Sequence, residues 1–272
     1  MNMTRGGRKS FKTKIFRLAS DHYRSVLVII GFFLFWEISV RLFKIPRIVL
    51  PAPSNALSVL LFKQPQANYH WALHFNTTLY EFLMAFIITS VLGIVISIIL
   101  VWSRHTKKLV MPLFIFINSL PIIAITPVIL LWMGYGVKTN MLIAFLVSFF
   151  PVVINTMTGL DAIEDDLLDL ARYLHASKLQ LLIKIRLPNS LPYIFSGLKI
   201  CATMSIIGAI VGEYLASDRG LGYIIIVAQV AMDTPPIFAS LIVISLMGAG
   251  LYVIITLLER LLMPWAYTKE RV

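Results

Sequence analysis

The stretch Gly159–Pro192 reads GLDAIEDDLLDLARYLHASKLQLLIKIRLPNSLP and interrupts a chain that is otherwise mostly apolar. Five of the 13 acidic residues fall within it, and four basic residues follow closely. Long apolar segments flank the stretch on both sides. A membrane protein that concentrates its charge in one internal loop is predicted to offer that loop to a soluble partner. We call this stretch, residues 159–192, the charged loop.

The composition around the charged loop predicts an all-α integral membrane protein. Of the 272 residues, 58% are hydrophobic, 14% are charged and the mean hydropathy is +0.85, whereas a soluble domain carries about 25% charged residues. The net charge of +11 indicates basic loops facing the cytoplasm and does not require nucleic acid. The single cysteine, Cys201, excludes an intramolecular disulfide.

Apolar segments long enough to cross the hydrocarbon core occur six times. Helices are required, because backbone polar groups in lipid must be paired within the segment. The first segment follows a basic start but has no small-residue cleavage site, which predicts an uncleaved span. The segments lie at about 26–43, 76–102, 110–134, 139–158, 193–216 and 237–263.

The distribution of lysine and arginine predicts the orientation. With the N-terminus inside, 18 of the 24 basic residues lie in inner regions and 6 in outer regions. Both termini and the charged loop are therefore predicted to be cytoplasmic. The predicted organisation is a basic tail (1–25), a first helix with its outer loop (26–75), the main membrane domain (76–263) and a short C-terminal tail (264–272).

Two membrane segments depart from a simple spanning helix. The third contains Pro112, Pro121 and Pro127, which predict a broken or kinked span. Between the last two spans, Leu221–Met232 is too short to cross and is predicted to be re-entrant or interfacial.

Ionisable residues within the spans are costly and therefore informative. Glu37 lies deep in the first span and is expected to be buried against another helix. Glu81 and Glu213 fall near outer span ends, where we expect a position at the membrane interface more than a polar pathway or an interhelical hydrogen bond. His70 and His74 share one helix face, but no third ligand is evident, so interfacial histidines are favoured over a metal site.

The charged loop has its own helical pattern. Apolar residues recur at helical spacing from Leu167 to Leu174, behind an acidic first turn that suits the helix dipole. A second short helix, about 178–185, is predicted to stop at Leu187-Pro188. The apolar stripe of the first helix can cover the protein's own inner surface or enter a groove on a partner.

Motifs for catalysis, cofactors and metals are absent from the sequence. It contains no phosphate-binding G-x-x-x-x-G-K-[ST] loop, no C-x-x-C pair and no H-E-x-x-H. A membrane enzyme is therefore disfavoured. A stand-alone secondary transporter or channel stays open as an alternative, although midplane coupling charges and repeat symmetry are not evident.

The end of the charged loop resembles the cytoplasmic loop of binding-protein-dependent ABC importer permeases. That family pattern is E-A-A-x3-G-x9-I-x-L-P, and DLARYLHASKLQLLIKIRLPNSLP follows it with three departures. Asp169 and Leu170 replace Glu and the first Ala, while His175 replaces the glycine, at a steric cost if φ is positive there. The matching positions are Asp169, Leu170, Ala171, His175, Ile185, Leu187 and Pro188.

The resemblance covers nearly the whole chain beyond the basic tail and is closest to the nitrate, sulfonate and taurine permeases. It implies a six-helix type I ABC importer transmembrane domain with a MetI-like fold, in the bacterial inner membrane. It also implies two cytoplasmic ATPase subunits, an extracytoplasmic binding protein and a second permease copy, which we expect to be identical. The segments that carry it are LPAPSNAL (50–57), NSLPIIAITPVILLWMGYG (118–136), FFPVVINTMTGL (149–160) and GEYLASDRGLGYII (212–225).

This resemblance implies an import subunit that hydrolyses nothing itself and moves a small organic or anionic solute. Sulfonates, nitrate and vitamin precursors such as pyrimidines all remain open. The expected ATPase-coupling residues are Asp165, Asp169, Leu170, Ala171, Leu174, His175, Ile185, Leu187 and Pro188. The expected translocation pathway comprises Asn118, Pro121, Thr126, Asn155, Ser205, Gly208 and Gly212, although the small residues among them would equally serve close helix packing.

Overall fold

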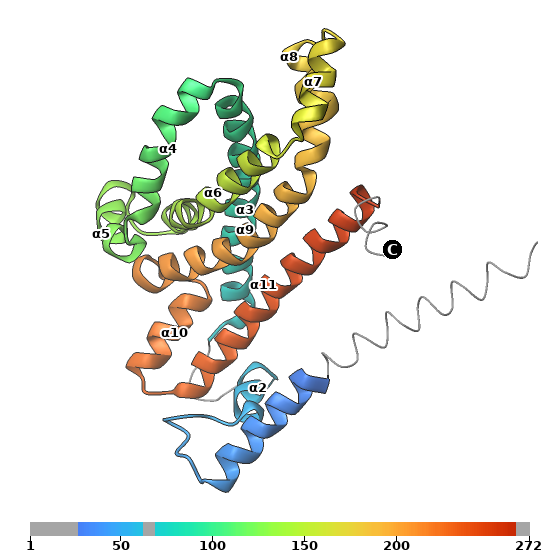
Figure 1. The fold of residues 1–272 in the computed structure, drawn as a ribbon. Helices are drawn as coiled ribbons and strands as arrows, with labels where there is room; N and C mark the ends of the chain where they lie inside the picture. The colour runs from blue at the N-terminus through green and yellow to red at the C-terminus, as the bar shows by residue number, and fades with distance from the viewer. Residues whose placement is uncertain (1–26, 62–68, 265–272) are drawn as a thin grey trace, which may run out of the picture.

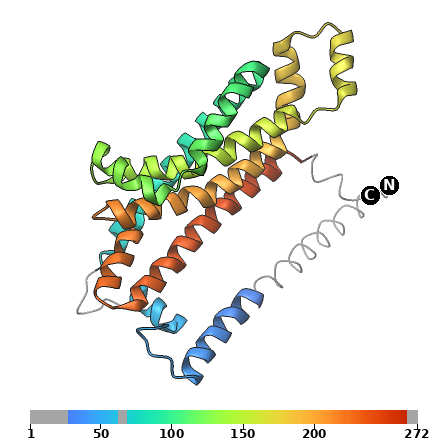
Figure 2. The ribbon, with the colours of Figure 1, turned by 60° about the vertical axis from the view of Figure 1, so that its left-hand side comes forward.

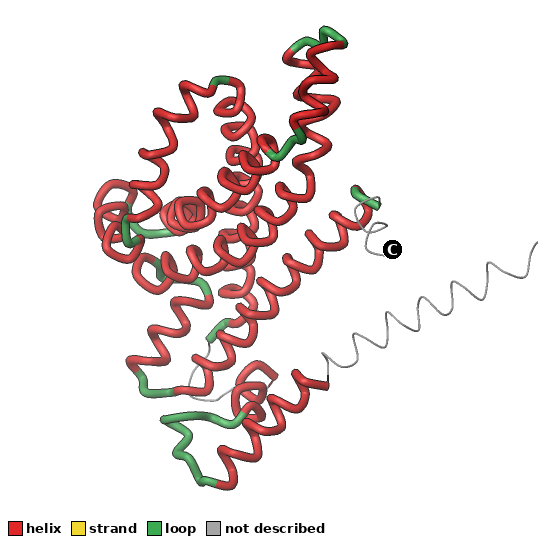
Figure 3. Tube along the Cα trace, viewed as in Figure 1, coloured by secondary structure: helices red, strands yellow, loops and turns green. Residues whose placement is uncertain are grey.

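A computed structural model describes residues 27–61 and 69–264, and all regular secondary structure in these ranges is helical (Figure 3). The predicted all-α class is therefore confirmed for the described residues. The predicted basic N-terminal tail and nearly all of the C-terminal tail lie outside them. In Figure 1 the helices form an elongated bundle, with the charged loop projecting from one end.

Four long apolar helices build the bundle: α3 (Trp71–Trp102), α6 (Val137–Asp161), α9 (Leu187–Ala216) and α11 (Thr234–Leu262). Helix α6 packs along α9 and α3, and α11 packs on the other side of α9 (Figure 1). Each helix is long enough to cross a membrane by itself. Figure 2 shows that the C-terminal end of α11 points toward the end of the bundle from which the charged loop projects.

The third predicted span is broken, as its prolines indicate. Helices α4 (Arg104–Ser119) and α5 (Ile122–Met133) meet at an angle of 94°. The break falls at Leu120, which is extended, as expected for a residue before proline. Pro112 and Pro127 instead lie inside α4 and α5. Counting this bent pair as one span, the described residues contain five helical segments long and apolar enough to cross.

The first helix is described over residues 27–42, and α2 (Pro53–Leu61) folds back beside it. Glu37 joins the two, because its Oε2 accepts a hydrogen bond from the Ser54 amide at 3.0 Å. This places a carboxylate at the positive end of α2, where the helix dipole favours it. Glu37 therefore contacts another helix as predicted, but it is half-buried and not fully buried as expected. Nearby, Trp36 packs on Phe238 at the start of α11, with ring centroids 5.4 Å apart.

Helices α6 and α9 approach each other closely because glycines face the contact. A Cβ added to Gly208 would lie 2.5 Å from the Ala144 Cα atom, and one added to Gly212 would lie 2.8 Å from the Asn140 Cα atom. Small residues permit this backbone approach in membrane helices, where dispersion contacts replace a hydrophobic driving force. The α6–α9 pair is therefore the most tightly packed part of the bundle's core.

The segment after the charged loop differs from expectation. Helix α8 (Lys178–Leu181) continues through a π-helical turn, η1 (Leu182–Arg186), directly into α9. The prediction that Pro188 ends the helix is therefore wrong. Pro188 lies in the first turn of α9, after the wider π turn in which the Leu187 amide bonds back to the Leu182 carbonyl. Proline is tolerated at such a first-turn position because its missing N–H is not needed.

Candidate functional site

The charged loop forms a compact two-helix projection. Helix α7 (Asp165–Tyr173) begins with two aspartates, and α8 begins with a capping box in which Ser177 and Gln180 exchange hydrogen bonds. The α8–η1–α9 run is one apolar helical segment from Lys178 to Leu215. A movement of the α7–α8 projection would therefore be transmitted along a continuous helix into the membrane bundle.

Helix α7 leaves most of its apolar side uncovered. Leu167, Leu170 and Leu174 are 43%, 53% and 67% exposed. In contrast, Ala171 is 6% exposed and points inward, and Leu168 lines a cavity against the membrane bundle. One of the two destinations considered for the apolar stripe is thus used, because its inner edge covers the protein itself, whereas its outer edge is uncovered. Ala171 belongs to the inner edge, so its small size serves packing within the projection.

The charged residues of α7 stay in solvent. Asp165 and Asp169 are exposed, and Asp169 pairs with Arg172 at 2.8 Å with both side chains at least 70% exposed. Such a surface ion pair adds little stability. These charges are available to surround the apolar stripe at a protein–protein contact.

His175 occupies a left-handed position at the end of α7. Its φ is 53°, the Ala176 amide donates to the Ala171 carbonyl at 2.9 Å, and the His175 amide donates to the Arg172 carbonyl at 3.0 Å. These two bonds form a Schellman motif, in which glycine is the usual left-handed residue. The turn of the family pattern is therefore kept although histidine stands at the glycine position.

We expect His175→Gly to stabilise this turn by about 1 kcal/mol, because histidine pays a steric cost at positive φ that glycine does not. Hydrogen exchange of the Ala176 amide should slow by roughly fivefold for that free-energy change. His175→Val should accelerate the same exchange, since a β-branched side chain is worse at positive φ. Equal exchange rates in the three proteins would contradict this account of the turn.

The base of the charged loop is tied to three membrane helices. Lys107 at the start of α4 forms an ion pair with Asp161 at the end of α6. Asn189 in the first turn of α9 donates its side-chain amide to the Ala162 carbonyl. The half-buried Ile185 and Leu187 lie in η1 and at the start of α9, and Pro188 is exposed. The motif residues Ile185, Leu187 and Pro188 therefore belong to this base, while Leu170 and Leu174 belong to the projecting end.

The expected pathway residues fall into two groups. Asn118 and Pro121 are exposed at the α4–α5 break, Thr126 is buried in α5, and Asn155 is half-buried in α6. The other three, in α9, are all buried: Ser205 donates to the Ala202 carbonyl, and Gly208 and Gly212 contact α6. The structure does not bring the seven residues together in one cavity, and packing accounts for both glycines.

A buried polar cluster holds the start of α10 (Leu221–Val230), the short apolar helix expected in this segment. The amides of Gly220, Leu221 and Gly222 would otherwise lack partners at this helix end. Gly220 N donates to His74 Nδ1 at 2.9 Å, and Leu221 N donates to Thr78 Oγ1 at 2.8 Å. Gly222 N donates to Glu213 Oε2 at 2.7 Å.

Glu81 and Glu213 belong to this cluster, so the expectation that favoured the membrane interface over an interhelical hydrogen bond is wrong for both. Each is fully buried. Glu213 also accepts from Thr78 Oγ1 at 2.5 Å, and Glu81 accepts from the Asn140 side-chain amide at 3.0 Å. The sequence signal for this arrangement is the pair Gly220 and Gly222. Gly220 has φ +103°, and a Cβ there would lie 2.1 Å from the Glu213 carboxyl carbon.

His74 is buried, and its Nδ1 accepts a hydrogen bond from the Gly220 amide. Among the described residues, no group of three or more His, Cys, Asp or Glu side chains is placed to hold a metal ion. The cluster is instead a polar clamp that joins α3, α9 and α10.

Removing the Glu213 side chain should destabilise the protein by about 2 kcal/mol, because Thr78 and the Gly222 amide lose their buried partner. Glu213→Gln should cost less than Glu213→Ala, since the amide retains one acceptor oxygen. Thermal unfolding of the purified variants measures both effects. An unchanged midpoint for Glu213→Ala would contradict the role of this carboxyl group in the clamp.

These features define a multi-pass helical membrane protein with one charged loop projecting from one end of the bundle. Residues 89–265 match the family model described as the binding-protein-dependent transport system inner membrane component. The chain therefore belongs to this family: it is a permease subunit of an ABC transporter and is not itself catalytic. Membership implies an ATPase and a solute-binding protein as partners.

Several relatives are similar to the chain along most of their length. The chain is 31% identical to the formylaminopyrimidine transport permease protein ThiX of Halalkalibacterium halodurans over 85% of this chain and 90% of that protein. It is 33% identical to the riboflavin transport system permease protein RibX of Chloroflexus aurantiacus over 85% of each. It is 30% identical to the putative aliphatic sulfonates transport permease protein SsuC of Bacillus subtilis, over 86% of this chain and 84% of that protein.

Proposed function

We propose that the chain is the membrane subunit of a type I importer in which α7 docks into a groove on a cytoplasmic ATPase. The observation that carries this proposal is the uncovered apolar stripe Leu167, Leu170 and Leu174 on α7, which a short turn joins to the continuous helix Lys178–Leu215 that enters the bundle. An apolar helix face with a charged rim fits a groove on a soluble protein. ATP-driven closure of two ATPase subunits would then move α8, η1 and α9 together.

The proposed topology has six spans with both termini in the cytoplasm. The helix at 27–42 supplies the first span, the α4–α5 pair supplies the third, and α10 is re-entrant. The threefold excess of basic residues in the inner regions supports this orientation. The domain boundaries expected from the sequence are retained in this proposal.

The proposed assembly contains a second, identical permease chain, and the pathway runs between the two copies. Large apolar side chains such as Leu131 and Trp132 on α5 are 86% and 78% exposed and support a helix contact beyond this chain. Asn118, Pro121 and Thr126 at or near the α4–α5 break and Asn155 in α6 remain proposed pathway residues. Ser205, Gly208 and Gly212 are proposed to position α9 against α6 beside that pathway.

The proposed solute is a small polar organic molecule or anion. The relatives named for formylaminopyrimidine, riboflavin and aliphatic sulfonates support this class. In this arrangement the binding protein selects the solute, and the permease opens a path for it.

Reconstitution tests the proposal. Vesicles that contain the permease and its ATPase, with the binding protein outside, should accumulate a ligand of that binding protein only when ATP is supplied on the ATPase side. The three named solute classes are the first to test. Uptake at full rate without the ATPase would reject the importer and favour a stand-alone transporter.

A further inference from the structure

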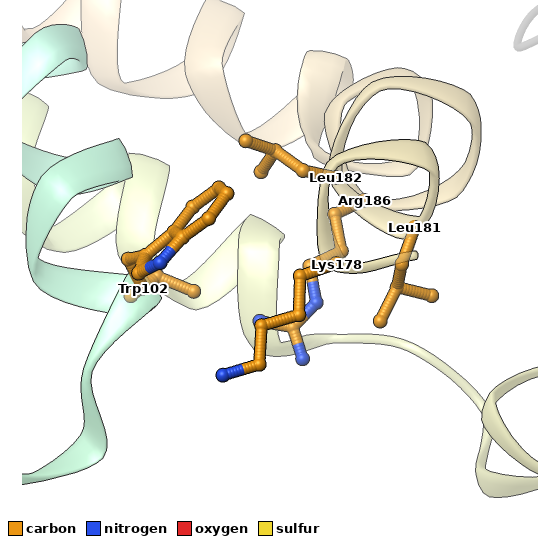
Figure 4. A pocket seen from close by; sticks show the side chains of 6 residues that line it. Trp102, Lys178, Leu181, Leu182 and Arg186 are labelled. Atoms are coloured by element: carbon orange, nitrogen blue, oxygen red, sulfur yellow. The ribbon is translucent and has the colours of Figure 1, made fainter. Parts of the chain in front are cut away.

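Two adjoining cavities lie between the charged loop and the corner where α3 turns into α4. Their volumes are about 200 and about 670 Å³, and Val101 and Arg186 line both. Basic side chains dominate their polar lining. We call the group Trp102, Lys107, Lys108, Lys178 and Arg186 the basic notch. In Figure 4, Lys178 and Arg186 extend from the charged loop into the smaller cavity, and Trp102 lies across from them.

The charges of the basic notch are not balanced by the protein. Four cationic side chains line the two cavities, and Asp161 is the one acidic side chain among the described lining residues. Asp161 pairs with Lys107, so the excess of positive charge remains. Like charges that face one cavity repel one another, and an anion in the cavity would relieve that repulsion.

Arg186 is the part of the basic notch that most clearly lacks a partner. Its Nε is buried and has no hydrogen-bond acceptor among the described residues. A buried donor left unpaired costs about 1–3 kcal/mol. The planar guanidinium group is suited to bind a phosphate through two parallel hydrogen bonds, so a phosphate group would satisfy this donor.

The start of α4 provides an independent argument. Lys107 and Lys108 lie near the N-terminal end of this 16-residue helix, and its first turn contains no acidic residue. Cations at a helix N-terminus oppose the helix dipole, whereas anions there are stabilised. An anion in the larger cavity would interact favourably with both lysines and with the positive end of α4.

The position of the basic notch at the end of a membrane span favours a lipid headgroup over a soluble ion as the bound anion. The apolar span of α3 ends at Trp102, which is 51% exposed, and tryptophan is enriched at the membrane–water boundary. Met111 lines the larger cavity, and Ile115, one turn further along the same face of α4, is 51% exposed. These two residues offer an apolar surface for an acyl chain. Basic pockets between membrane helices at the cytoplasmic surface are suited to anionic lipid headgroups.

We infer that the basic notch binds the phosphate of an anionic phospholipid. The headgroup lies between Arg186, Lys178 and the start of α4, and an acyl chain lies along α4. Because Lys178 and Arg186 belong to α8 and η1, the lipid would connect the moving base of the charged loop to the α3–α4 corner. The inference rests on the proposed cytoplasmic position of the charged loop, but lipid binding itself needs neither ATPase nor nucleotide.

The test is a titration of the purified full chain in neutral detergent. Dioleoyl-phosphatidylglycerol, dioleoyl-phosphatidylcholine and inorganic phosphate are added separately, and native mass spectrometry and the unfolding midpoint report binding. We expect at least tenfold tighter binding of phosphatidylglycerol than of phosphatidylcholine. The double variant Lys178→Gln/Arg186→Gln should lose that preference. The matched control Arg47→Gln/Lys138→Gln removes the same charge from exposed positions and should keep it.

Three outcomes overturn the inference: equal binding of the two lipids, an unchanged preference in the double variant, or a midpoint shift by inorganic phosphate equal to that by phosphatidylglycerol. The last outcome would assign the site to a soluble anion. A photoreactive phosphatidylglycerol on the natural chain provides a test that no folding defect can obscure. It should label the peptide that contains Trp102 or Leu181, and labelling confined to other peptides contradicts the inference.

Failure of this site and failure of the proposed importer are distinguishable. If the natural chain shows no lipid preference but binds the ATPase, only the lipid site is rejected. Retained lipid preference without ATPase binding rejects only the docking of α7.

Discussion

Replacing Leu170 and Leu174 together with aspartate should lower the affinity for the ATPase by at least about 100-fold and abolish ATP-driven uptake. Both side chains, on α7 and at its C-terminal cap, are more than half exposed, so the change disturbs the packing of the projection little. Apolar anchors at the centre of an interface typically contribute about 2 kcal/mol or more each, and 2.7 kcal/mol corresponds to about 100-fold in affinity. The two new charges would also enter the groove without partners.

The matched control for this prediction is Leu179→Asp on α8. Leu179 is 55% exposed, as Leu170 is 53% exposed, but it does not belong to the α7 stripe. The Leu179→Asp variant should bind the ATPase with an affinity within a few-fold of that of the natural chain. Affinity for the ATPase is measured by titration of the detergent-solubilised chain. Equal loss in both variants would show that the stripe is not the specific contact.

Gly208→Leu should prevent correct folding of the membrane bundle, at a cost of at least about 3 kcal/mol, because the new side chain would meet the backbone of α6. A Cβ alone would lie 2.5 Å from the Ala144 Cα atom and 3.1 Å from its amide nitrogen. Backbone atoms cannot move aside as the end of a flexible side chain can, so α6 and α9 would have to separate. We expect aggregation or an unfolding midpoint too low to measure.

Gly250→Leu on α11 makes the same chemical change where there is room. A Cβ at Gly250 meets no atom within 4 Å, and leucine has a higher helix propensity than glycine. This variant should elute as a single species in size-exclusion chromatography and unfold near the natural midpoint. If Gly208→Leu behaved in the same way, the close α6–α9 contact would not exist in the folded protein.

The features that could be predicted well from the sequence are those determined by residues close together in the chain. The acidic first turn and apolar spacing of α7 specify an amphipathic helix wherever it docks. Pro121 constrains Leu120 directly, so the break between α4 and α5 needs no tertiary information. The prediction that the apolar segment of α10 is too short to cross a membrane likewise needs only the length of that segment.

Features that depend on which helices meet were harder to predict. Glu81 and Glu213 occupy positions near span ends, and their burial follows from the packing of α3, α6, α9 and α10 around them. The π turn before Pro188 was missed because the rule that proline stops a helix assumes regular α-helical bonding. The partition of the α7 leucines between inner and outer edges also required the fold of the charged loop.

The basic notch illustrates the same limit. Lys107 and Lys108 are 70 or more positions from Lys178 and Arg186 in the sequence, and folding brings all four to the same two cavities. The local signal was the occurrence of lysines near the N-terminal end of a helix, which the dipole disfavours.

The most direct test of the account is cysteine cross-linking from Leu174→Cys at the exposed end of α7. The natural Cys201 is fully buried, so the new thiol is expected to be the reactive one. A bifunctional maleimide should join Cys at position 174 to the ATPase subunit, and an impermeant maleimide should label it in inside-out vesicles and not in intact cells. Labelling from outside intact cells, or no ATPase adduct in the assembled transporter, would contradict the account.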